Sequence, residues 1–267
     1  TIGIEAAVAG GIPIVKAIRE GLSGIGIHQL FGILNGTCNY ILSEMRETGR
    51  DFDEVLREAQ DLGYAEADPT FDIDGIDTAH KLAILSSIAF GCEINFESVH
   101  VEGIRHISPL DIQFAKDLGY RIKLLGMAKK TKIGIQQRVH PCMVPISTPI
   151  AHVEGVYNAV VTEGSFVGQT MYEGRGAGEG PTATAIVADI IDIALARTTN
   201  LFLLPTDKLE KMHVAPMSSY RGSYYARFMV IDKTGVFATI ANALNDNGVS
   251  MESVLQRGRS ESEAVPV

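Results

Sequence analysis

Alternating apolar and polar residues in the middle of the chain predict a set of β-strands. The alternation and the β-branched residues recur at 99–107, in a long pair within 120–146, and at 159–174. Residues 129–134 (KKTKIG) and the triplet Glu163-Gly164-Ser165 predict the turns of two hairpins. Helical patterns stand between these strands, so we predict an α+β fold in which helices cover a mixed or antiparallel sheet.

Apolar residues at helical spacing predict the helices. The pattern at 52–62 is amphipathic, with Asp51 as its cap and Gly63 as its stop. Further helices are predicted after Pro13, after Asn35-Gly36-Thr37, over 76–90, around 111–118, and after the glycine-rich loop 174–180. The last of these carries Ile186, Ile190, Ile193 and Ala194 on one stripe. A β-like run precedes Gly10-Gly11, and a strand precedes Asn35.

The C-terminal part has a pattern of its own. Residues 198–222 contain Pro205, Pro216 and a polar SSYRGS cluster, so we predict a connector there. Beyond it, a strand, a turn at Asp232–Gly235, an amphipathic helix and a strand after Asn247-Gly248 predict a β-α-β unit. The last residues, SESEAVPV, are polar and are expected to end the chain without a strand.

Five acids and one lysine gather where the 76–90 helix begins. They are Glu66, Asp68, Asp72, Asp74, Asp77 and Lys81. Pro69 predicts a loop before the helix, and Asp77 and Lys81 then stand at i and i+4 on the stripe that continues to Leu85 and Ile88. A lysine held by carboxylates and turned toward the interior or a cleft can transfer protons. Alternatively, the acids only favour the helix dipole and the pair lies on the surface.

Three other segments combine glycine with the start of a helix, which is a favourable place for an anion. They are Gly10-Gly11, Gly36-Thr37 and Gly176-Ala177-Gly178. Each also has a structural interpretation: a tight turn, an N-cap, and a tight loop before a buried helix. The chain contains no GxGxxG motif. No role is assigned to Asn35 or Cys38.

Composition excludes several classes of function. The chain has 267 residues, 46% of them hydrophobic, and a net charge of −9, which disfavours nucleic acid and anionic membranes as partners. No apolar run approaches the roughly 18–20 residues of a membrane span. The first residues lack the basic region of a signal peptide, and the three cysteines form no CxxC, so we expect free thiols and a cytoplasmic protein. The histidines lack metal-ligand spacing.

The string GYAEADPTFDIDGIDTAHKLAIL (63–85) resembles the catalytic segment of the homoserine dehydrogenases, and GRGAGEGPTA (174–183) resembles a second segment of that family. The resemblance implies catalytic roles for Lys81, Glu66 and Asp77. It implies that the substrate is bound by Gly36, Thr37, Tyr64, Glu66, Asp72 and Asp77. The implied reaction is the NAD(P)-dependent, reversible reduction of L-aspartate 4-semialdehyde to L-homoserine, in threonine, methionine and isoleucine biosynthesis.

The same resemblance implies two kinds of bound group. Gly176, Ala177 and Gly178 would touch the NADP or NAD cofactor, whose main site would lie in an N-terminal Rossmann domain that this sequence lacks. The segment EAAVAGGIPI would bind a monovalent cation, Na⁺ or K⁺, through the carboxylate of Glu5 and main-chain carbonyls at Val8, Gly10 and Ile12. The choice between NAD and NADP would be made in the absent domain.

The resemblance also implies a domain organisation. We expect a catalytic and dimerisation domain at 1–197, a linker at 198–222, and at 223–267 a partial ferredoxin-like ACT domain, a regulatory module that binds amino acids. A fragment of this kind is expected to be inactive alone and to form a homodimer or homotetramer. The alternative is a non-catalytic sensing or assembly module with a threonine effector at its ACT-like end. A sensor has no need of the Glu66, Asp77 and Lys81 constellation.

Overall fold

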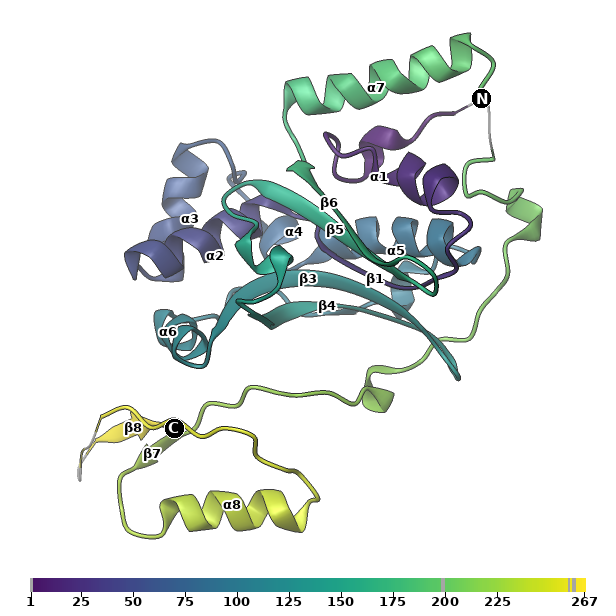
Figure 1. The fold of residues 1–267 in the computed structure, drawn as a ribbon. Helices are drawn as coiled ribbons and strands as arrows, with labels where there is room; N and C mark the ends of the chain where they lie inside the picture. Colours follow the sequence, from purple (N-terminus) through teal and green to yellow (C-terminus); the bar gives the residue numbers. More distant parts are fainter. Residues whose placement is uncertain (1, 198–199, 259, 261–262) are drawn as a thin grey trace. The chain divides into compact units, whose positions relative to one another are not determined.

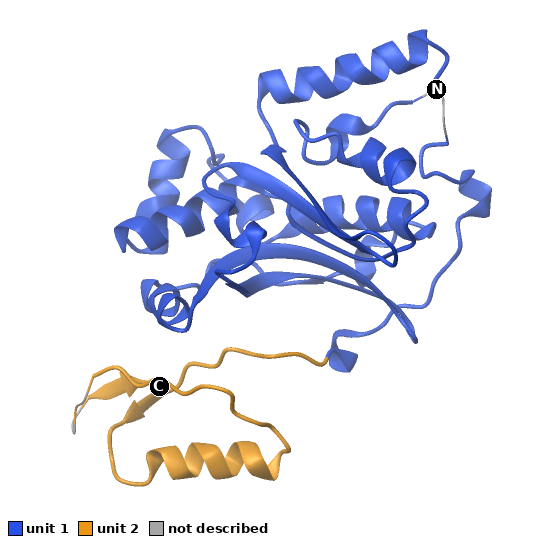
Figure 2. Ribbon diagram, in the orientation of Figure 1, with its two compact units in different colours: residues 1–220 blue, residues 221–267 orange. Residues whose placement is uncertain are grey.

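The computed structural model describes residues 2–197, 200–258, 260 and 263–267. The chain divides into two compact units, Thr1–Tyr220 and Arg221–Val267 (Figure 2). The predicted linker does not stand apart from the first unit, because Phe202 and Ala215 are buried and Val214 forms a bridge with Ile135. The functional boundaries expected at 197 and 222 stay predictions.

A six-stranded sheet is the centre of the first unit (Figure 1). Its order is β2-β4-β3-β1-β5-β6, and only β2 and β4 run parallel. The strands are β1 (Ile27–Ile33), β2 (His100–Val101), β3 (Tyr120–Thr131), β4 (Gly134–Pro145), β5 (Tyr157–Gly164) and β6 (Gly168–Arg175). The predicted α+β fold with a mixed sheet and flanking helices is confirmed, and both predicted hairpins form.

Helices pack on this sheet, and α5 lies across β1, β3 and β4. The helices are α1 (Ile14–Lys16), α2 (Gly36–Thr48), α3 (Phe52–Asp61), α4 (Thr70–Ile73), α5 (Ile76–Phe90), α6 (Pro109–Asp117) and α7 (Glu179–Ala194). Helix α5 lies close to β3 at Gly126, where a Cβ would lie only 3.1 Å from Thr78 of the helix and 3.2 Å from Leu34. Helices α1 to α6 and one face of the sheet thus share the larger hydrophobic core.

The other face of the sheet has a smaller core. Ile33, Leu125, Val144, Ala159 and Val161 are buried there against the 3-10 helix η4 (Pro149–His152) and the residues around it. Phe31, Met127 and Met171 on the same face stay half-buried. This face is therefore only partly covered by the chain itself.

Two strand predictions in the first unit are wrong. The β-like run before Gly10 is instead the 3-10 helix η1 (Glu5–Ala7), because the Glu5 carboxylate bonds the first amides of the next helical segment. The strand expected at 99–107 stops at Val101. There the chain turns away from the sheet to α4, where the Ile104 N–H donates to the Ile73 carbonyl at 2.8 Å and Gly103 leaves no room for a Cβ.

The second unit corrects the predicted C-terminal strand. Its elements are β7 (Met229–Ile231), α8 (Val236–Asp246) and β8 (Ala264–Pro266), and β7 and β8 are antiparallel. The strand expected after Asn247-Gly248 does not form, because the Val249 N–H returns to the Leu244 carbonyl of the helix. The partner strand instead comes from the AVP of the segment that was expected only to end the chain. Residues 261 and 262 of that segment lie outside the described residues.

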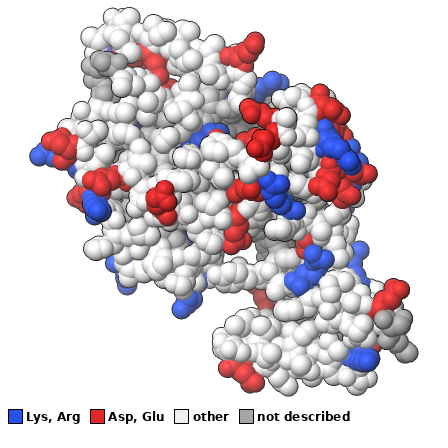
Figure 3. All heavy atoms as spheres, turned by 180° about the vertical axis from the view of Figure 1, so that it is seen from behind, with Lys and Arg blue, Asp and Glu red and all other residues white. Residues whose placement is uncertain are grey.

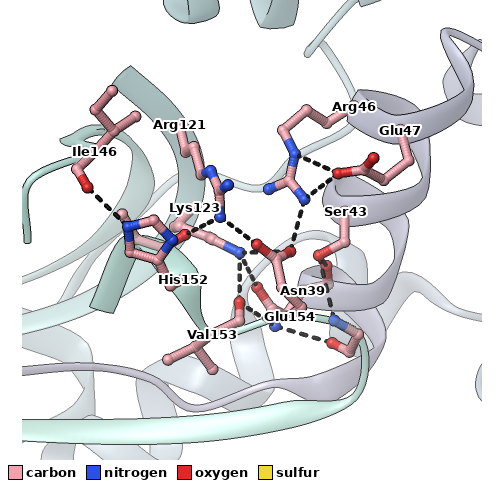
Figure 4. Close-up of polar contacts among 12 residues, drawn as sticks. Asn39, Ser43, Arg46, Glu47, Arg121, Lys123, Ile146, His152, Val153 and Glu154 are labelled. Atoms are coloured by element: carbon pink, nitrogen blue, oxygen red, sulfur yellow. Dashed lines mark hydrogen bonds and ion pairs between the residues drawn. The ribbon is translucent and has the colours of Figure 1, made fainter. Parts of the chain in front are cut away.

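Lys123 of β3 is the most deeply buried charged side chain among the described residues of the first unit. It is 1% exposed, and its Nζ donates to Asn39 Oδ1 at 3.0 Å and to the Val153 carbonyl at 2.5 Å (Figure 4). The Glu154 carboxylate is 3.6 Å away. Burial lowers the pKa of Lys123 from 10.5 to about 8, and the attraction of Glu154 opposes this change.

We expect Lys123→Met to change how stability depends on pH. Between pH 8 and 10.5 the unfolded chain keeps the Lys123 proton while the folded chain releases it, so the free energy of unfolding rises with pH. The rise is about 3 kcal/mol and is absent from Lys123→Met. Urea unfolding at pH 7 to 10 measures it, with the exposed Lys116→Met as the matched control. A wild-type minus Lys123→Met difference that is constant with pH would contradict this expectation.

Candidate functional site

The predicted acid–lysine pair forms at the start of α5. Lys81 Nζ lies 2.7 Å from Asp77 Oδ2 and donates to the Leu34 carbonyl at 3.1 Å. The two side chains are 22% and 18% exposed, so the pair is neither free in solvent nor sealed in the core. Leu85 and Ile88, on the same stripe, are buried. The ion pair therefore sits at the edge of the interior, as the helical spacing predicts.

Asn35 joins this pair to a second carboxylate. Its Nδ2 donates to Asp72 Oδ1 at 2.8 Å and to Asp77 Oδ2 at 2.9 Å, while its Oδ1 accepts the Cys38 N–H at 2.8 Å and caps α2. Burial raises the pKa of Asp72 above its ordinary value, the hydrogen bond from Asn35 opposes this, and the charge of Asp77 adds to it. A neutral amide thus holds two like charges together beside Lys81.

Sequence reasoning missed Asn35. The signal was its position between a strand and the Gly36-Thr37 helix start, where an asparagine caps through its oxygen and leaves its NH₂ group for neighbouring acids. The acids lie far along the chain and come close only because α4 packs beside α2. No local pattern records that contact.

The other acids of the cluster have different surroundings. Asp74 pairs with Arg105, and Asp68 accepts the Thr70 N–H at the start of α4. Glu66 is exposed, and its carboxylate forms no hydrogen bond or ion pair with another described residue. The structure therefore brings Asp72 and Asp77 to Lys81 and leaves Glu66 facing solvent.

Thr37 and Tyr64 also meet. Thr37 Oγ1 donates to the Tyr64 carbonyl at 2.6 Å, and the ring of Tyr64, 43% exposed, packs edge-on against Tyr40. Gly36 is close to the chain around Val156, where a Cβ would lie 2.8 Å from the Val156 carbonyl oxygen. The predicted substrate residues Gly36, Thr37 and Tyr64 thus form one contact group at the start of α2.

The glycine loop before α7 lies at the same end of the strands as the carbonyl that Lys81 contacts. The register places Ile33, Ala159 and Glu173 in one row across β1, β5 and β6. The ends of β1 and β6 therefore leave the sheet two strand spacings apart, roughly 10 Å. Lys81 bonds the carbonyl that follows Ile33, and Gly176 follows the end of β6.

The glycines of this loop have local structural causes. A Cβ at Gly176 would lie 2.2 Å from Cγ of the buried Asn158, and Gly178 has φ +108°. The N–H of Gly10 donates to the Gly176 carbonyl at 2.8 Å, so the predicted cation segment and the predicted cofactor loop are joined. No side chain caps the N-terminus of α7, which leaves its first amides available to an anion.

The α7 helix itself is not buried. Ile186, Ile190 and Ile193 of the predicted stripe are 47%, 58% and 43% exposed, and Val187, Ile191 and Leu195 are exposed beside them. The structural interpretation expected a buried helix after the tight loop, and this part of it is wrong for the described residues. In Figure 3 the surface over this helix, at the top of the view, carries few charged side chains.

Glu5 of the predicted cation segment is buried. Its two carboxylate oxygens accept the N–H groups of Val15 at 3.0 Å and Lys16 at 2.9 Å. Desolvation raises the pKa of Glu5, and the two backbone hydrogen bonds oppose it. Each oxygen keeps a further lone pair, and Val8, Gly10 and Ile12 lie buried in the adjoining turn. Carboxylate and carbonyl oxygens are the kind of donor that a hard cation prefers.

The described residues contain no metal-binding cluster of side chains. No three His, Cys, Asp or Glu side chains of this part of the chain lie close enough to hold a metal ion. All three cysteines are free. Within the described ranges, no helix has the length and apolar character needed to cross a membrane. On the face in Figure 3, Lys and Arg are scattered among acidic side chains.

A mixed sheet with helices packed on one face places the first unit among α+β domains. The family model described as homoserine dehydrogenase matches residues 13–191. The chain belongs to the homoserine dehydrogenase family.

Relatives agree with this assignment. A homoserine dehydrogenase of Pseudomonas aeruginosa is 49% identical over 99% of this chain and 62% of its own length. The crystal structure of a homoserine dehydrogenase from Thiobacillus denitrificans has a TM-score of 0.91 and 50% identity, over 98% of this chain and 61% of that one. A hyperthermophilic archaeal homoserine dehydrogenase mutant in complex with NADPH has a TM-score of 0.62 and 32% identity, over 72% and 55%. The chain thus spans about three fifths of the first two relatives.

We expect Asn35→Ala to raise the pKa of Asp72 further, because the hydrogen bond that favours its charged form is lost. Loss of the cap and of the bridge should also destabilise the fold by about 1–3 kcal/mol. Carboxyl ¹³C NMR titration measures the pKa, and urea unfolding measures the stability. Asn95→Ala, which removes a similar cap at η3 (Phe96–Ser98), is the control and should leave Asp72 unchanged. An unchanged Asp72 titration in Asn35→Ala would refute the bridge.

Proposed function

We propose that the longer protein represented by this chain reversibly reduces L-aspartate 4-semialdehyde to L-homoserine with NAD(P)H, and that this chain supplies the substrate site. The observation that carries the proposal is Lys81, held 2.7 Å from Asp77 and tied through Asn35 to Asp72, within the region matched by the family model. The chain alone is expected to be inactive, because relatives of the family are considerably longer.

Each charged group has a role that its surroundings allow. Lys81 donates a proton to the oxygen of the substrate carbonyl during reduction and accepts it during oxidation. Asp77 orients the lysine, and together with Glu66 it holds the ammonium and hydroxyl ends of the substrate. Glu66 reaches the substrate from the exposed side, and Asp72 supports Asp77 through Asn35. Gly36, Thr37 and Tyr64 form the wall of the pocket.

NADP or NAD is the proposed cofactor, and it supplies the hydride. It would contact the uncapped start of α7 and the backbone of Gly176, Ala177 and Gly178. These lie at the end of the strands where Lys81 contacts the residue after β1. The related archaeal enzyme in complex with NADPH supports this proposal. We further propose that a Rossmann domain elsewhere in the longer protein covers the exposed apolar stripe of α7.

A monovalent cation, Na⁺ or K⁺, is the second proposed bound group. The Glu5 carboxylate would hold it together with carbonyls of Val8, Gly10 and Ile12. The raised pKa of the buried Glu5 supports this role, because a cation beside the carboxylate would stabilise its charged form. The bond between Gly10 and Gly176 would couple this site to the cofactor loop.

A regulatory function for residues 223–267 is a second candidate, in which the unit would be part of an ACT domain that binds threonine. The observation in its favour is a cavity of about 460 Å³ beside the turn before α8, lined by Asp232, Lys233, Thr234, Gly235, Phe237, Ala238 and Gln256. Isothermal titration of the chain with threonine, with serine for comparison, tests it. The absence of heat at millimolar threonine would reject this role.

We also propose that the protein is cytoplasmic, and its free thiols support this proposal.

We expect Lys81→Met in the full-length protein to lower kcat at least about 10²-fold, the usual cost of losing a general acid. The circular dichroism spectrum should stay unchanged, because the pair lies at the edge of the core. Lys116→Met on α6 is the matched control and should keep normal turnover. Near-normal turnover of Lys81→Met would remove this lysine from the mechanism, and loss of helical signal would favour a structural role.

We expect the chain to form a homodimer through the half-covered face of the sheet, where Phe31, Met127 and Met171 remain half-buried. Sedimentation velocity across a tenfold dilution should show a single dimeric boundary. Met171→Glu should shift it to monomer, whereas Gln169→Glu, at the exposed end of the same strand, should not. A wild-type monomer at micromolar concentration contradicts the proposal, and a broad distribution indicates aggregation instead.

A further inference from the structure

Lys123 and Asn39 hold the loop 153–157 in place. Lys123 Nζ donates to the Val153 carbonyl, and Asn39 Nδ2 lies within hydrogen-bond distance of the carbonyls of Val153, Gly155 and Tyr157, at 3.1, 2.9 and 3.2 Å. Ser43, one turn further along α2, accepts the Gly155 N–H at 3.3 Å. Lys123 and Asn39 are each 1% exposed, so water cannot replace their hydrogen bonds. The loop is therefore fixed to β3 and α2 by buried polar contacts (Figure 4).

Positive charges outnumber negative charges around Lys123. Glu154 faces Lys123 at 3.6 Å, but it also pairs with Arg46 of α2 at 2.9 Å and with Arg121 of β3. One carboxylate thus serves three cations, and Lys123 receives its closest contacts from the neutral oxygens of Asn39 and Val153. A buried lysine in such surroundings is costly, because methionine fills a similar volume without desolvating a charge. Stability alone does not explain it.

The same loop touches the candidate substrate pocket. Its Val156 carbonyl is so close to Gly36 that a Cβ there would lie only 2.8 Å away. Gly36 begins α2, between Asn35, which bridges Asp72 and Asp77, and Thr37, which bonds the Tyr64 carbonyl. A shift of the loop would therefore move the first turn of α2 and, with it, both the carboxylate bridge and the contact with Tyr64.

From this chain of contacts we propose that Lys123 and Asn39 are positioning residues for the substrate site: they clamp loop 153–157 so that Val156 fixes the first turn of α2. They act through Gly36, Asn35 and Thr37 and need not touch the substrate themselves. The proposal rests on the proposed function only for its kinetic consequence. Its structural consequence, the placement of Asn35 against Asp72, can be measured without catalysis.

The test compares Lys123→Met with Thr162→Val. Thr162 is equally buried and hydrogen-bonded, to Thr170, but it lies on β5 away from the loop. In the full-length enzyme, Lys123→Met should raise KM for the amino-acid substrate and lower kcat/KM at least about tenfold, with a smaller change in kcat. Thr162→Val should change neither constant, although it too removes a buried hydrogen bond.

The second measurement is the ¹³C NMR titration of Asp72 in this chain. Lys123→Met should shift the pKa of Asp72, because Asn35 moves, and Thr162→Val should not. Ser43→Ala loosens the same loop without removing a charged side chain and should shift the pKa of Asp72 in the same direction by less. It therefore decides the matter if Lys123→Met does not fold. If Lys123→Met and Ser43→Ala change the pKa of Asp72 and the KM no more than Thr162→Val does, the clamp has only a structural role and the proposal is overturned. A shifted pKa of Asp72 in this chain, together with a wild-type full-length protein that does not reduce L-aspartate 4-semialdehyde, would support the clamp while refuting the proposed reaction.

Discussion

The site depends on one amide placed between two carboxylates. Asp72 and Asp77 repel each other in a partly desolvated position, and the NH₂ group of Asn35 offers one hydrogen bond to each. Because the oxygen of the same amide caps α2, the position of this helix and the spacing of the acids are set by a single side chain. Lys81 then places a positive charge 2.7 Å from Asp77. The strand, the two helices and the ion pair are thereby locked into one geometry.

Local features of the fold could be read from the sequence with good success. Helix α5 occurs where its apolar stripe predicts it, and Asp51 caps α3 as expected. The long hairpin of β3 and β4 turns within KKTKIG. These features depend on residues a few positions apart, for which periodicity and capping carry the information.

Features that depend on distant residues could not be read. The N-terminal segment has the composition of a strand but becomes a 3-10 helix, because Glu5 bonds amides ten residues away. Asn35 looks like an ordinary turn residue until α4 brings Asp72 to it. The apolar stripe of α7 predicts a buried helix, yet these residues find no cover in the described part of the chain. A stripe indicates that a face needs a partner, and the partner can lie elsewhere.

Glu154 shows how misleading surface position can be. With 38% of its side chain exposed, it resembles the many glutamates that tolerate replacement. Yet it pairs with Arg46, Arg121 and Lys123, so this one carboxylate links helix α2 and strand β3 electrostatically. Replacing it would leave three positive charges facing one another around a loop. Among naturally occurring variants of this chain, Glu154 should therefore vary as little as a core residue, and any change there should be accompanied by the loss of at least one of its three cations.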